Sequence, residues 1–133
     1  RNYDRVEALT ERESLEKTWL PCPGEVLLPE LRAICTPAKE LCNGPDAFTV
    51  IPQGEIYLRS RQSGDEIRLY GGRKSLKKLF IDRKIPAAQR MRIPVVCDEA
   101  GILGVYSIGV NLDRSAAGES AVTIRFEKRD KGE

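Results

Sequence analysis

The sequence has no histidine, so the commonest general base and the commonest zinc ligand are missing from this chain of 133 residues. Ser–His and Cys–His nucleophile pairs are therefore excluded. No other set of nucleophile, base and orienting group can be named, and we expect no catalytic residue here. The acidic pair Asp98-Glu99 is predicted to lie in a solvated turn, and Asp65 is predicted to form a turn.

Cysteine is scarce, and no two of the four cysteines form a C-x2-C pair. This spacing argues against a zinc site with four thiolate ligands, and we expect no metal or cofactor in this chain. The even number of thiols allows disulfides, but the sequence is neither short nor rich in cysteine. We therefore expect four reduced cysteines in a cytoplasmic protein, with Cys97 packed as a core residue. The other three are Cys22, Cys35 and Cys42.

Long hydrophobic runs are also lacking, so no segment is predicted to span a membrane, and no signal-like region is present. Hydrophobic residues make up 41% of the chain and charged residues 32%, with a net charge of only +2, which is typical of a soluble globular protein. The length fits one domain, or one domain with a subdomain. Because the sequence begins at Arg1 without a methionine, we expect a piece of a longer polypeptide.

Positive charge is present and is concentrated in one block. Residues 56–94 carry eleven Lys or Arg against three Asp or Glu, a local net charge of +8, whereas both flanking segments are negative. Such a block is typical of a protein that binds a polyanion. The plainer alternative is a well-solvated surface. The basic residues are Arg59, Arg61, Arg68, Arg73, Lys74, Lys77, Lys78, Arg83, Lys84, Arg90 and Arg92.

Short strands are predicted on both sides of this block, because prolines and turn residues interrupt the apolar runs every few residues. A short strand is predicted over Tyr3–Leu9. Thr10 and Glu13 then have the spacing of a capping box for a short helix that runs to about Trp19, and a charged connector is the equally weighted alternative to this helix. We divide the chain into a linking region over 1–50 and a C-terminal binding domain over 51–133. The predicted strands are 25–28, 31–36, 47–51, 56–61, 67–69, 95–97, 102–106 and 121–126, followed by a frayed tail from Glu127.

A basic helical hairpin is predicted in the middle of the chain. Gly71-Gly72 opens the first helix, Ser75 caps it, and an apolar stripe of Leu76, Leu79 and Phe80 faces the core. Pro86 begins a second short helix that ends near residue 91. Strands, then helices, then strands indicate an α+β fold in which the helices cover one side of a sheet.

Phosphate contacts are predicted on this hairpin, since its exposed cations can follow a line of phosphates. The glycine turn at Tyr70–Ser75 resembles a phosphate seat but lacks P-loop spacing. Few aromatic residues lie among the cations, which favours recognition of structured RNA by backbone and shape. Asp82 is expected to form an ion pair with its basic neighbours. The predicted phosphate-binding residues are Arg73, Lys74, Lys77, Lys78, Arg83, Lys84, Arg90 and Arg92.

A long pattern in this region is specific to one family. The run K-L-F-I-D-x-K-I-P at residues 78–86, with Gly64–Arg68 and Gly71–Ser75 before it and Arg90 and 92–96 after it, resembles the C-terminal domain of bacterial tRNA(Ile)-lysidine synthetase. The resemblance covers about residues 56–112. Ser107 stands where the family usually has glycine, and we expect this difference to affect only the local turn.

The resemblance implies a fold and a role. Members of the family use ATP and lysine to convert the wobble cytidine of an isoleucine tRNA to lysidine. The resemblance places catalysis in an N-terminal domain with an S-G-G-x-D-S loop; that motif is absent here, so this chain alone should be inactive. It also implies a layered β/β/α domain, similar to a domain of the phenylalanyl-tRNA synthetase β chain. The implied partners are the acceptor-stem side of isoleucine tRNA and the catalytic domain of the same chain.

Two other roles stay open from the residues alone. The basic face could dock onto an acidic protein surface, such as the catalytic domain of the parent enzyme. The turn at Gly71–Ser75 could bind a small phosphate compound. The sequence also leaves open whether the chain forms a homodimer.

Overall fold

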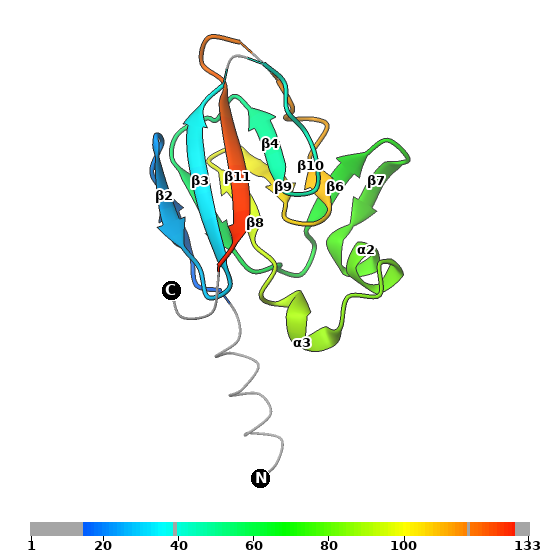
Figure 1. Cartoon of the computed structure of the whole chain (residues 1–133). Coiled ribbons are helices and arrows are strands. Elements are labelled where there is room, and N and C mark those ends of the chain that lie inside the picture. Colours follow the sequence, from blue (N-terminus) through cyan, green and yellow to red (C-terminus); the bar gives the residue numbers. More distant parts are fainter. Residues whose placement is uncertain (1–14, 39, 117, 130–133) are drawn as a thin grey trace.

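The fold has three layers in the computed structural model, which describes residues 15–38, 40–116 and 118–129 (Figure 1). Two antiparallel sheets pack face to face, and a β-hairpin with two short helices forms the third layer. The five-stranded sheet has the order β1 (Thr18–Leu20), β5 (Ile56–Arg59), β8 (Val95–Asp98), β9 (Gly101–Val105) and β10 (Gly109–Val110). The four-stranded sheet has the order β2 (Gly24–Leu27), β3 (Leu31–Pro37), β11 (Val122–Lys128) and β4 (Ala47–Val50). The third layer comprises β6 (Glu66–Leu69), β7 (Gly72–Ser75), α2 (Leu76–Asp82) and α3 (Ala87–Arg90).

The first hydrophobic core lies between the two large sheets. Alternation along the strands fills it, since Ile56 and Leu58 of β5 point into this space and Tyr57 points to the other face. A β-carbon added at Gly104 would lie 2.9 Å from Cδ2 of Phe48, which leaves no room for a side chain at residue 104. Glycine in β9 thus lets the ring of the opposite sheet approach its backbone.

The second hydrophobic core lies on the outer face of the five-stranded sheet. Val95 and Cys97 of β8 belong to it, whereas Val96 between them belongs to the first core. Leu79 and Phe80 of α2 pack against this face together with Ile67 of β6. The predicted α+β fold, with helices over one side of a sheet, is therefore confirmed.

The start of the basic helix differs from the prediction. Gly72–Ser75 forms strand β7, which pairs with β6 across a turn at Tyr70 and Gly71, and the helix begins only at Leu76. The turn is stabilised by Gly72, whose φ of 112° suits a residue without a β-carbon. The glycine turn therefore enters a strand and does not open the helix, whose N-terminus lies at Ser75, so the phosphate seat predicted for the glycine turn lacks a helix directly behind it. The predicted cap is confirmed, because Ser75 Oγ accepts a hydrogen bond from the backbone N–H of Lys78.

The two ends of the described chain also correct the predictions. Thr18–Leu20 is strand β1 and pairs with β5, so a helix running to Trp19 is wrong; Tyr3–Leu9 and the capping box at residues 10–13 lie outside the described residues. Strand β11 extends to Lys128 because it pairs along its whole length with β3, so Glu127 belongs to a strand and not to a frayed tail. The four-stranded sheet joins strands from both sides of the predicted boundary at residue 50.

The cysteines are only partly as expected. Cys22 and Cys35 form a disulfide with their α-carbons 5.2 Å apart, so the prediction of four reduced cysteines is wrong. The pairing follows from the sheet, because Cys35 of β3 lies opposite Gly24 at the start of β2. Cys97 is a buried free thiol, as predicted, and burial raises its pKa to about 11.

Within the described residues, no helix is long and apolar enough to cross a membrane, and no group of acidic or thiol side chains has a metal-binding arrangement.

Candidate nucleic-acid interface

Helix α2 presents two lysines on its outer side. Its buried residues Leu76, Leu79 and Phe80 define the side that faces the sheet. Successive residues of a helix are about 100° apart, which places Lys77 and Lys78 on the opposite half. Both lysines are exposed, and neither forms an ion pair with any described residue.

Lys84 follows α2 in an unusual backbone conformation. The N–H of Ile85 bonds to the carbonyl of Phe80 at 3.0 Å, and the N–H of Lys84 bonds to that of Ile81 at 2.9 Å. These are the two hydrogen bonds of a Schellman motif, in which the residue after the C-cap is left-handed and usually glycine. Lys84 occupies that position with a φ of 58°. An exposed lysine thus holds a conformation that glycine would adopt at lower cost.

Strand β7 carries the next two predicted contacts. Lys74 is exposed, and its Cε lies 3.6 Å from where a β-carbon at Gly71 would stand, so its side chain lies back over the hairpin turn. Arg73 pairs with Asp113 at 3.1 Å, and its cross-strand partner Arg68 pairs with the same carboxylate at 3.5 Å. These half-exposed ion pairs fix the hairpin to the loop after β10, and each adds little stability.

The remaining three predicted residues have partners in the fold. Arg83 donates to the carbonyl of Ser107 at 3.3 Å, and Arg90 donates from Nε to the carbonyl of Ile85 at 2.9 Å. Arg92 pairs with Glu30. Ser107 has a φ of 69°, a left-handed conformation that glycine adopts more easily than serine. The eight predicted cations therefore divide into four lysines without ion pairs in the described chain and four arginines that also hold the structure.

The ion pair expected for Asp82 is not formed with any described residue. Its basic neighbour Arg83 donates to the carbonyl of Ser107 instead. The acidic partner in this layer is Asp113, which is brought in from a distant loop.

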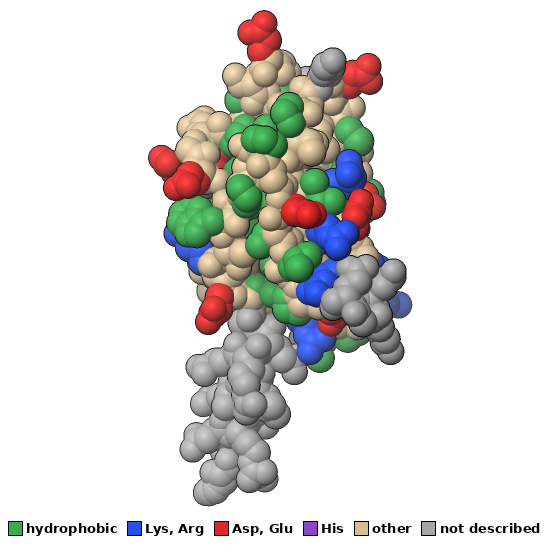
Figure 2. Space-filling model, turned by 60° about the vertical axis from the view of Figure 1, so that its left-hand side comes forward, with side chains coloured by type: hydrophobic (Ala, Val, Ile, Leu, Met, Phe, Trp, Pro, Cys, Tyr) green, Lys and Arg blue, Asp and Glu red, His purple; other side chains and the backbone are tan. Residues whose placement is uncertain are grey.

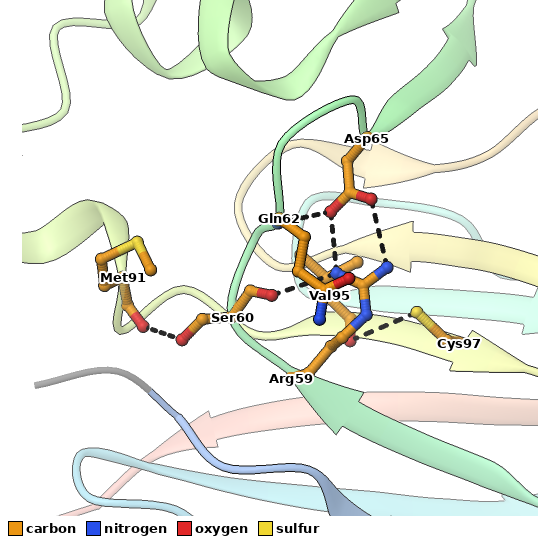
Figure 3. Close-up of polar contacts among 7 residues, drawn as sticks. All are labelled: Arg59, Ser60, Gln62, Asp65, Met91, Val95 and Cys97. Carbon is orange, nitrogen blue, oxygen red and sulfur yellow. Dashed lines mark hydrogen bonds and ion pairs between the residues drawn. The ribbon is translucent and has the colours of Figure 1, made fainter. Parts of the chain in front are cut away.

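Arg59 belongs to the interior rather than to the basic surface. Figure 3 shows its guanidinium against Asp65, with contacts of 2.7 and 3.1 Å, and Asp65 also accepts from the N–H of Gln62 at 2.8 Å. Burial is the largest influence and tends to lower the pKa of Arg59, but the hydrogen bond and charge of Asp65, together with Cys97 and Tyr57, outweigh it in sum and the pKa is raised. The ion pair closes the loop between β5 and β6, which confirms Asp65 as a turn residue. The charge of Arg59 is neutralised within the fold by that of Asp65.

Asp98 is also internal, so the prediction of a solvated turn is wrong for this residue. It ends β8, and its carboxylate oxygens lie 3.0 and 2.6 Å from the two terminal nitrogens of Arg114. The backbone N–H groups of Gln53 and Ala100 donate to the same carboxylate at 2.7 and 2.8 Å. Burial alone would raise the pKa of Asp98, but these donors together lower it. The exposed turn residue is its neighbour Glu99.

The charge on other faces is mixed. Figure 2 brings the side of β2 forward, and basic and acidic side chains alternate along its right-hand side, between exposed hydrophobic side chains. On the outer face of β11, for example, Arg125 lies 3.8 Å from Glu127. The lysines of β7 and α2 differ from these cations because no described acid neutralises them.

The sequence reasoning missed Trp19, which lies on the outer face of the five-stranded sheet. Trp19 of β1 lies directly opposite Tyr57 of β5, and Lys17 lies over both rings. Strand β1 has only three residues, too short for an alternation pattern to reveal it.

The structure is a small α+β domain. Two packed sheets support an outer layer, formed by a hairpin and a helix, that carries the exposed lysines. Residues 56–126 match the family model described as the TilS substrate C-terminal domain, and the chain belongs to this family. A crystal structure of a TilS C-terminal domain superposes with a TM-score of 0.73 at 26% identity, covering 87% of this chain and all of that one.

Curated relatives are similar over part of the chain. The tRNA(Ile)-lysidine synthase of Clostridioides difficile is 41% identical over 78 residues, which cover 57% of this chain and 17% of the relative. That of Geobacillus kaustophilus is 37% identical over 115 residues, covering 76% of this chain and 24% of the relative. The chain thus spans about a quarter or less of these relatives.

Proposed function

We propose that this chain is the tRNA-binding C-terminal domain of an ATP-dependent tRNA(Ile)-lysidine synthase that acts in the cytoplasm. The relatives that carry this name, and the family to which the chain belongs, support the proposal. Catalysis, and the use of ATP and lysine, would belong to another domain of the parent enzyme. The chain alone would hold isoleucine tRNA on its acceptor-stem side without modifying it.

One observation carries the binding role. Lys74, Lys77, Lys78 and Lys84 are exposed on one layer, and none forms an ion pair within the described chain. Lysine binds phosphate as a mobile point charge, so this surface suits the backbone of an A-form stem. Arg73, Arg83, Arg90 and Arg92 would flank these contacts while keeping their partners in the fold.

Lys84 gives the sharpest test, because here stability and binding should change in opposite directions. Replacing it by glycine relieves the left-handed backbone and should raise the free energy of unfolding by about 1 kcal/mol. The same change removes one phosphate contact. For wild type we expect a log–log salt slope of roughly −4 to −6 for tRNA binding, and for Lys84→Gly a slope flatter by about one.

Urea unfolding and tRNA binding at several salt concentrations measure both quantities. Ser107→Gly is the matched control, since it relieves a left-handed serine without removing a charge, and it should raise stability while leaving the salt slope unchanged. A Lys84→Gly chain that is more stable and binds tRNA with an unaltered slope would remove Lys84 from the interface.

A protein-docking role is the second candidate, favoured by one residue. Ile81 lies on the outer side of α2 and is 48% exposed, so the lysine surface includes an apolar side chain suited to a protein contact. In this role the basic face would meet an acidic surface of the catalytic domain. Weak tRNA binding together with tight, salt-sensitive binding of that domain would favour it over the tRNA role.

A further inference from the structure

An exposed aromatic pair lies at the edge of the five-stranded sheet, on the face that α2 also packs against. Trp19 and Tyr57 face each other across β1 and β5, with ring centroids 5.5 Å apart and planes at 65°. Trp19 is 51% exposed, although a large ring on a sheet is usually covered. The ammonium of Lys17 lies 4.6 Å from the indole centroid and 4.4 Å from the phenol centroid. This is a cation–π cluster with one aromatic surface open.

A hollow of about 430 Å³ is lined by Tyr57 of this pair and by Lys17, Arg59, Arg61 and Met91, among others. Trp19 does not line it but lies beside it, across from Tyr57. None of the described residues that line it is acidic. The floor is held in place by the contacts in Figure 3: Arg59 binds Asp65, and Ser60 Oγ donates to the carbonyl of Met91. Since Asp65 balances Arg59, the charges at the hollow that no described acid pairs with are those of Lys17 and Arg61.

Arg61 supplies an independent sign of a ligand. Its Nε is buried and has no hydrogen-bond partner in the described structure. Buried donors are nearly always satisfied, so this N–H calls for an acceptor that the fold does not provide. A phosphate oxygen in the hollow is a suitable acceptor once the side chain turns to expose Nε, because guanidinium groups bind phosphate through several N–H donors at once.

We propose that this hollow binds an unpaired nucleotide of an RNA ligand, with its base against Trp19 and its phosphate on Arg61. An aromatic platform beside uncompensated cations is the common arrangement of single-strand binding sites. The volume falls in the range of small-ligand sites, about 300–1,000 Å³. Lys17 moves from the rings to the phosphate as the base stacks. The site rests on the proposed RNA-binding function and adds to it: the α2 surface holds the paired stem, and this hollow holds a nucleotide that extends from it.

The chain has a single tryptophan, so its fluorescence reports on this site alone. The probes are an RNA hairpin with a blunt stem and the same hairpin with four unpaired 3′ nucleotides. The extended RNA should quench the emission and bind about tenfold more tightly than the blunt one, since stacking of one base is worth about that factor. Trp19→Ala and Arg61→Gln should each remove this advantage and leave the affinity for blunt RNA unchanged.

Trp19→Phe keeps an aromatic ring and should retain most of the advantage, which separates stacking from a loss of folding. Tyr70→Ala is the matched control, since Tyr70 is 98% exposed at the tip of the β6–β7 hairpin and lies outside the hollow. Equal affinity of wild type for the two hairpins would overturn the nucleotide site while leaving the stem-binding function intact. The same conclusion would follow if polyglutamate displaced the extended RNA as readily as single-stranded RNA does. Binding of neither hairpin would overturn both.

Discussion

Phe80→Ala should lower the free energy of unfolding by about 3–5 kcal/mol, the usual range for removing a fully buried phenylalanine. The ring is completely buried in the second core, where it packs with Ile67 and Val95. It fastens α2 to the five-stranded sheet, so the cavity would open beneath the helix that carries Lys77 and Lys78. Urea unfolding of both proteins measures the loss.

The next residue provides the control for this prediction. Ile81 is on the same helix but is 48% exposed, and Ile81→Ala should change stability by well under the Phe80 value. Similar losses for the two variants would show that α2 does not dock on the sheet through Phe80.

Asp98→Asn should cost about 3–5 kcal/mol at pH 7, because it leaves the guanidinium of Arg114 without its carboxylate in a largely buried site. The side chain of Asp98 is fully buried and that of Arg114 is 15% exposed. The substitution keeps the shape of the side chain, so the loss reports the charge. Glu99→Gln, in the exposed turn beside it, is the control and should have little effect.

The same pair predicts how stability depends on pH. The pKa of Asp98 is lowered in the folded state, so the unfolded chain binds a proton at this group more readily. Its contribution is present above the unfolded pKa of about 3.9 and is lost as the pH falls below that value. Wild type should therefore lose more stability than Asp98→Asn between pH 5 and pH 2, as measured by urea unfolding. Equal losses would contradict the ion-paired state of Asp98.

Local pattern was enough to predict much of the fold. The strands at 31–37, 47–50 and 56–59 and the hairpin of β8 and β9 follow from apolar alternation and from turn residues, which act over a few positions. The stripe of Leu76, Leu79 and Phe80 located the helix and its buried side. By contrast, Arg73-Lys74 has no apolar alternation, and only the pairing with β6 makes it a strand. Such pairing is a tertiary effect that short-range patterns miss.

The candidate site divides in the same way. Exposure of the lysines on α2 could be predicted, because a charged residue outside an apolar stripe faces solvent. Which arginines are neutralised could not, since Asp113 is 40 residues from Arg73 and Glu30 is 62 residues from Arg92. Trp19 and Tyr57 likewise meet only through the pairing of β1 with β5. The scarcity of aromatics in the basic block thus concealed an aromatic pair formed across the sheet.

The most direct test of the tRNA-binding role compares two double charge reversals. Lys77→Glu with Lys78→Glu reverses the outer side of α2, and Arg125→Glu with Lys128→Glu makes the same change of charge on β11 of the opposite layer. We predict that binding of isoleucine tRNA falls steeply for the α2 variant, with a salt slope flatter by about two, and changes little for the β11 variant. Equal affinities for the two folded variants would contradict the assignment of the lysine surface to RNA phosphates.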